Sequence, residues 1–93
     1  MPGICRNNVD LAGVCDYGLP PTNANSGSPD VFVNNNELHR VGDTFTPHGC
    51  GTRVSTGGSS SVFCNNQPVT RLGDPVNDGA VIITASDNVY AGG

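Results

Sequence analysis

The apolar residues of this chain fall in short runs separated by turn-forming residues, without the 3.6-residue period of a helix. Residues 30–34 and 61–64 are rich in β-branched and aromatic side chains, which favour strands. Asparagines, which tolerate the positive φ of a tight hairpin turn, follow each run. Return strands are expected over residues 37–41 and 68–72, so the pattern predicts two short β-hairpins.

The other segments are shorter or less regular. Residues 5–10, 52–56, 80–85 and 89–90 predict further short strands. Residues 16–27 contain repeated Gly, Pro and Asn and predict a loop. We expect no helix of ordinary length.

The two predicted hairpins are copies of one another, 31 residues apart. Ser28, Phe32 and Asp43 fall on Ser59, Phe63 and Asp74, and the asparagine pairs and R-x-G-D endings also coincide. A third copy opens at residues 86–90, and Arg6 and Asp10 resemble its missing ending. We interpret residues 1–93 as one domain with units at about 28–58, 59–85 and, split between the two chain ends, 86–93 with 1–15.

No single unit carries enough apolar side chains to form a core of its own. Three units around an axis could bury them together, which predicts an all-β, pseudo-threefold fold of short hairpins. A chain this small still needs a metal, a disulfide or a partner to supplement its core. The expected core residues are Val31, Phe32, Leu38, Val41, Val62, Phe63, Val69, Leu72, Val81, Ile82, Ile83 and Val89.

The formal net charge of −4, with only four basic residues, argues against binding to nucleic acid or to anionic lipid. No apolar run approaches the roughly 20 residues of a membrane-spanning helix. The chain start lacks the charged and apolar regions of a signal peptide, so we expect any export to use other machinery.

The candidate metal ligands gather after the first R-x-G-D ending. His48 and Cys50 are alternate residues of an extended segment, so their side chains would point the same way. Cys15 follows Asp10 by the same five residues that separate His48 from Asp43, which predicts that the two meet near the axis. Imidazole and thiolate are zinc ligands, usually four to a structural site, and His39 is the fourth candidate.

Each candidate has an alternative role. His48 and Cys50 could form an ordinary buried pair, and Cys15 could join Cys50 in a disulfide or be a buried thiol. His39 could simply be packed or hydrogen-bonded, and Asp78, a possible donor from the third copy, lies in an N-D-G turn. Cys5 and Cys64 are expected to be small apolar side chains.

The frame of these motifs resembles the PAAR-repeat family. The motifs are G-S-P-D-V-F-V-N-N, H-R-V-G-D and H-G-C, then V-F-x-N-N-x-P-V-x-R-L-G-D-P-V and the S-x-N-V-Y-A-G-G ending. Of the Pro-Ala-Ala-Arg stretch that names the family, only Arg40, Arg71 and Pro68 are kept. The resemblance covers nearly the whole chain, least securely residues 15–25, and is closest to phage tail-spike members.

This resemblance implies a small, cone-shaped domain on the blunt end of a trimeric β-helical spike in contractile phage tails and type VI secretion systems. One tip would cap each trimer, sharpen it and make transient contact with the outer membrane of the target cell. A structural metal ion, usually Zn²⁺ with iron as the alternative, would pin the vertex. The protein would then reside in a virion or be secreted through a contractile apparatus.

We do not expect an enzyme or a small-molecule substrate. A Cys–His nucleophile needs a base, an orienting group and a pocket, and this chain has little room to enclose a substrate. The main alternative function is a small, non-catalytic, zinc-stabilised module that binds another partner. A spike tip differs from such a module in needing a flat, partly apolar triangular face that matches a trimer.

Overall fold

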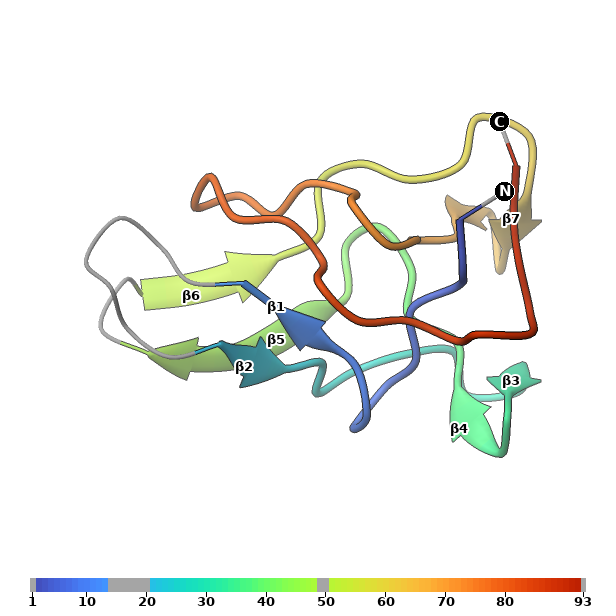
Figure 1. Ribbon diagram of the computed structural model, residues 1–93, viewed down its shortest axis with the longest axis horizontal. Coiled ribbons are helices and arrows are strands. Elements are labelled where there is room, and N and C mark those ends of the chain that lie inside the picture. Colours follow the sequence, from blue (N-terminus) through green and yellow to red (C-terminus); the bar gives the residue numbers. More distant parts are fainter. Residues whose placement is uncertain (1, 14–20, 49–50, 93) are drawn as a thin grey trace.

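The computed structural model describes residues 2–13, 21–48 and 51–92 and, of His48 and Gly51, the backbone alone. In this part of the chain there are eight short strands and no helix, hence no helix that could cross a membrane. The strands pair in chain order as four antiparallel two-stranded ribbons (Figure 1). They are β1 (Leu11–Ala12), β2 (Thr22–Asn23), β3 (Phe32–Val33), β4 (Asn36–Glu37), β5 (Thr44–His48), β6 (Gly51–Val54), β7 (Phe63–Cys64) and β8 (Gln67–Pro68). The prediction of an all-β domain of small hairpins is confirmed.

Both predicted hairpins form. The turn between β3 and β4 has φ of 50° at Asn34 and 70° at Asn35, and the turn between β7 and β8 has 53° at Asn65 and 66° at Asn66. Two consecutive positive φ values give the turn that matches the twist of a tight hairpin. The return strands are shorter than predicted. The N–H groups of Leu38 and Val69 still donate to their own hairpins, but beyond these two residues the chain pairs with other units.

The remaining predictions of strand and loop are partly wrong. The longest strand, β5, was not predicted, and β2 lies within the predicted loop at residues 16–27. The predicted strands at residues 80–85 and 89–90 make only isolated bridges in the structure. These segments take their partners from distant parts of the chain, so local composition was a poor guide.

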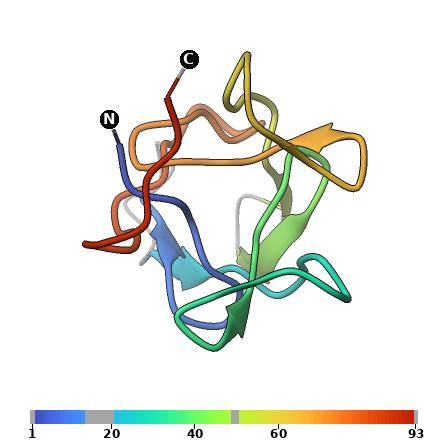
Figure 2. The same cartoon turned by 90° about the vertical axis from the view of Figure 1, so that its right-hand side faces the viewer.

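A closed ring of three backbone hydrogen bonds joins the units at the centre of the molecule. The N–H of Cys5 donates to the carbonyl of Thr70 (2.9 Å), that of Thr70 to His39 (3.2 Å) and that of His39 to Cys5 (3.1 Å). All three residues are fully buried. The units therefore surround an approximate threefold axis, and the triangular outline in Figure 2 has the same symmetry.

The two ends of the chain pair with one another as the strands of each hairpin do. The N–H of Ile4 donates to the carbonyl of Val89 (2.9 Å), as that of Leu38 does to Val31 (2.9 Å). Gly3 bridges to Tyr90, and this pair corresponds to the pair of Glu37 and Phe32 in the first hairpin. The terminal segments thus supply the third set of contacts around the axis.

An arginine and an aspartate close the same turn in each unit. The aspartate accepts hydrogen bonds from both the backbone N–H and the guanidinium of the arginine, with Nε–Oδ2 distances of 2.7–2.9 Å. Gly42 and Gly73 supply the positive φ of two of these turns, 92° and 89°, where a side chain would be strained. The pairs are Arg6–Asp10, Arg40–Asp43 and Arg71–Asp74.

The units are also tied to each other in a cycle. Asn65 accepts hydrogen bonds from Ser28 Oγ (2.7 Å) and Arg40 Nη1 (3.1 Å) of the preceding unit. Asn34 accepts in the same way from Ser86 Oγ (2.6 Å) and Arg6 Nη1 (3.5 Å). The Gly92 carbonyl completes the cycle by accepting from Ser59 and Arg71. Side-chain hydrogen bonds therefore link each unit to the next around the axis.

Candidate functional sites at the two ends

One end of the molecule, here called the base, is formed by the β3–β4 hairpin, the β7–β8 hairpin and residues 87–91 (Figure 1, right-hand end, which faces the viewer in Figure 2). Three aromatic residues of these segments are largely exposed: Phe32 (56%), Phe63 (57%) and Tyr90 (49%). They occupy matching register positions, opposite Glu37, Pro68 and Gly3. The base thus presents three like aromatic groups around the axis.

The prediction that the valine and aromatic residues of both hairpins are core is wrong in large part. Alternate side chains of a strand face opposite sides. Val33 and Cys64 point inward (4% and 6% exposed), which leaves Phe32 and Phe63 facing solvent. Leu38, Val69 and Ile82 are buried as predicted, Val41 and Val89 are half-buried, whereas the exposed members of the predicted core are Val31, Phe32, Val62, Phe63, Leu72, Val81 and Ile83. Cys5 and Cys64 are buried thiols, as predicted.

Three carboxylates border the base: Asp30, Glu37 and Asp87. Asp30 and Asp87 are exposed and Glu37 is half-buried. Hydrogen bonds from Asn65 and Ser28 hold the pKa of Asp30 below its ordinary value, so this group is charged at neutral pH. The base combines exposed aromatic rings with negative charge.

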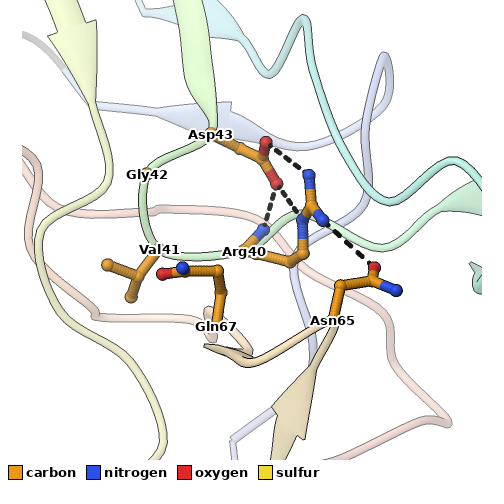
Figure 3. Close-up of a pocket in the computed structure, with 6 residues that line it drawn as sticks. All are labelled: Arg40, Val41, Gly42, Asp43, Asn65 and Gln67. Carbon is orange, nitrogen blue, oxygen red and sulfur yellow. Dashed lines mark hydrogen bonds and ion pairs between the residues drawn. The ribbon is translucent and has the colours of Figure 1, made fainter.

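A shallow open pocket lies at the seam between the first two units (Figure 3). Its charged groups are Arg40 and Asp43, which bind one another, and Arg40 also reaches Asn65. The other lining residues are Val41, Gly42 and Gln67. The two charged groups of this pocket are thus paired with one another, and the rest of its lining is an amide, a valine and a glycine beside Asn65.

The predicted metal ligands lie mostly outside the described residues. The backbone of β5 ends at His48, opposite the first residue of β6, at the end of the molecule far from the base (Figure 1). Cys15 and Cys50 lie in the undescribed segments, as does the side chain of His48. Among the residues whose side chains are described, no group of three His, Cys, Asp or Glu is placed to hold a metal. The metal site stays a prediction.

His39 lies at the centre of the molecule with both ring nitrogens hydrogen-bonded. Nδ1 lies 3.0 Å from the carbonyl oxygen of Ser26, and Nε2 lies 2.8 Å from Oγ of Ser55. A carbonyl can only accept, so Nδ1 carries the proton and the Ser55 hydroxyl donates to Nε2. Burial lowers the pKa of His39, and its ring packs on Phe45 with centroids 4.5 Å apart. As placed, His39 is a neutral packing residue.

Arg53 is a functional candidate that the sequence analysis missed. Its side chain is fully buried, and its Nε donates to Asp78 Oδ2 (2.7 Å). Nη1 donates to Thr22 Oγ1 (3.0 Å) and Nη2 to the Gly13 carbonyl. The guanidinium therefore ties β6 to β2, to the segment after β1 and to the N-D-G turn. Asp78, considered above as a metal donor, is engaged here.

Comparison with known proteins agrees with the resemblance noted from the sequence. The profile of the PAAR motif matches residues 20–84, and a search of curated proteins finds no significant match. Proteins with this motif are structural components of the spike tip of type VI secretion and related contractile injection machines, and they associate with spike proteins. Since the match spans more than half of the sequence, the chain belongs to the PAAR family.

Proposed function

We propose that the protein caps the blunt end of a trimeric β-helical spike, one tip per trimer, and leads that spike through the outer membrane of a target cell. The observation that carries this proposal is the set of three exposed aromatic residues at the base, Phe32, Phe63 and Tyr90. The protein would accordingly be found in a virion or be secreted through a contractile apparatus.

The symmetry of the base supports a trimeric partner. A single chain can make three similar contacts with a threefold-symmetric surface only if its own contact residues repeat around an axis. Phe32, Phe63 and Tyr90 do so, because each occupies the same position in its unit. Aromatic side chains bury a large area and are often the residues that dominate interface energies.

The construction of the body supports a mechanical role. The three Arg–Asp turns and the cycle of bonds through Asn34, Asn65 and Gly92 hold the units in one arrangement. Tight turns with defined positive φ leave little backbone freedom between the strands. Such a body can transmit axial force without rearrangement.

We propose that His48, Cys50 and Cys15 hold one structural metal ion, Zn²⁺ or iron, beyond the end of β5. One neutral imidazole and two thiolates are suited to zinc, which when bound would cross-link the strands and add its binding energy to folding. His39 joins these ligands only by exchanging its bond to Ser26 or Ser55 for a bond to the metal.

The role we propose is not catalytic. The seam pocket presents an internally paired guanidinium and carboxylate, which supports a structural module rather than an enzyme. The alternative is a zinc-stabilised module that binds another partner. The two functions differ in whether binding requires the aromatic residues of the base. Only a spike tip requires all three aromatic positions at once.

The test uses purified tip and the purified trimeric spike of the same machine. The variant Phe32→Ser/Phe63→Ser/Tyr90→Ser should lose at least 100-fold in affinity, since aromatic anchors commonly contribute about 2 kcal/mol each. The matched control is Val81→Ser/Ile83→Ser, which removes apolar side chains that are 43% and 44% exposed outside the base. We expect the control to bind normally. Equal binding by the base variant and the wild type would refute the proposal.

A further inference from the structure

The carboxylates that border the base outnumber the arginines available to pair with them. The sequence has no lysine, and its four arginines all form ion pairs. Their partners are Asp10, Asp43, Asp74 and Asp78. Among the described residues, no arginine is therefore left to form an ion pair with Asp30, Glu37 or Asp87.

These carboxylates lie next to the exposed rings. Glu37 is the register partner of Phe32, so the two side chains share one face of the ribbon. Asp30 precedes Phe32 by two residues, and Asp87 precedes Tyr90, whose hydroxyl donates to the Asp87 carbonyl. The second unit has Ser60, Ser61 and Pro68 at the corresponding positions, so its side of the base is neutral.

We propose that the surface that receives the base carries lysine or arginine side chains around an apolar centre. This inference rests on the proposed function and specifies the chemistry of the spike end. On a threefold partner each basic position occurs three times, so two copies would face the acidic units and one the neutral unit. Complementary charge at the edge of an interface speeds association and disfavours partners that carry the wrong sign.

The test measures the association rate of tip and trimeric spike from about 50 to 500 mM NaCl, because screening of exposed charges grows over this range. The test variant is Asp30→Asn/Glu37→Gln/Asp87→Asn, which keeps the side-chain shapes. We expect wild-type association to slow roughly tenfold or more with salt. The neutral variant should associate several-fold more slowly at low salt and depend little on salt.

The control variant, Thr52→Lys/Thr56→Lys/Val81→Lys, changes the net charge by the same three units at exposed positions outside the base. It should retain most of the salt dependence. If the wild type binds and the neutral variant matches it at every salt concentration, the charged border is irrelevant while the spike proposal stands. If neither binds at any salt concentration, the proposed function fails, and this inference fails with it.

Discussion

The Nε of Arg53 lies 2.7 Å from the Asp78 carboxylate, and the arginine side chain is fully buried. The same guanidinium reaches Thr22 and the carbonyl of Gly13. Charged side chains are almost never fully buried unless they are paired, so the burial of Arg53 requires this contact. It ties segments far apart in the sequence together independently of any metal.

We predict that Arg53→Met lowers the free energy of unfolding by about 3 kcal/mol, because it leaves the Asp78 carboxylate without its buried partner. Chemical denaturation of metal-free protein measures this change. Arg53→Lys keeps the charge but cannot make all three contacts, so it should fall between Arg53→Met and the wild type. Adding Asp78→Leu to Arg53→Met should recover part of the loss. Unchanged stability of Arg53→Met would show that the pair does not hold the segments together.

A second prediction concerns the bonds between units. Asn65→Gly keeps the positive φ of the turn but removes hydrogen bonds to Ser28 and Arg40, so it should cost about 1–3 kcal/mol of stability. Asn66→Gly, at a φ of 66°, is the control for the backbone change, since its side chain makes none of these contacts. Thermal or urea unfolding compares the two. Equal effects would mean that the side chain of Asn65 adds nothing.

The third prediction concerns acid stability. Burial alone would raise the pKa of Asp43, but hydrogen bonds from the Arg40 guanidinium and backbone N–H outweigh it and lower the pKa. Unfolded aspartates titrate near pH 3.9. The stability that Asp43 contributes is therefore complete above that pH and is lost as pH falls through the lower pKa of the folded protein.

The Asp43→Asn variant lacks this titration. Its free energy of unfolding should change less than that of the wild type between about pH 5 and 2, a range that spans the unfolded pKa. Urea denaturation at a series of pH values measures both slopes. Identical slopes would show that Asp43 titrates alike in the folded and unfolded states.

The fourth prediction concerns the metal. Purified protein should contain about one equivalent of zinc or iron, and a chelator should lower the melting temperature. His48→Ala should lose metal and stability together, as elemental mass spectrometry and thermal melts would show. Full metal content and stability in this variant would exclude His48 as a ligand.

His39→Thr separates the two roles open to His39, because threonine occupies the matching position, Thr70, in the second unit. The engaged ring nitrogens favour retention of the metal with a lower melting temperature. Loss of the metal would instead make His39 a ligand.

The hairpins could be predicted from sequence because their information is local. The asparagine pairs specify the turns, and β-branched and aromatic residues specify the flanking strands. The repeat likewise identified Arg40 and Arg71 as equivalent positions, and in the structure each pairs with the aspartate that ends its turn. These features need only a few neighbouring residues.

The rest depends on contacts between distant segments. Phe32 and Phe63 were expected in the core. The neighbouring side chains Val33 and Cys64, on the opposite face of each strand, pack against other units instead. Nothing in the local sequence marks Arg53 as buried, since its partners lie 25 residues or more away. In each case the three-dimensional pairing of the units decided the outcome.

The most direct test of the account is native mass spectrometry of the tip mixed in excess with its trimeric spike. We predict a single complex of one tip and three spike chains, which disappears with Phe32→Ser/Phe63→Ser/Tyr90→Ser. A complex with three tips per trimer, or a one-to-three complex that survives loss of all three aromatic side chains, would contradict the account.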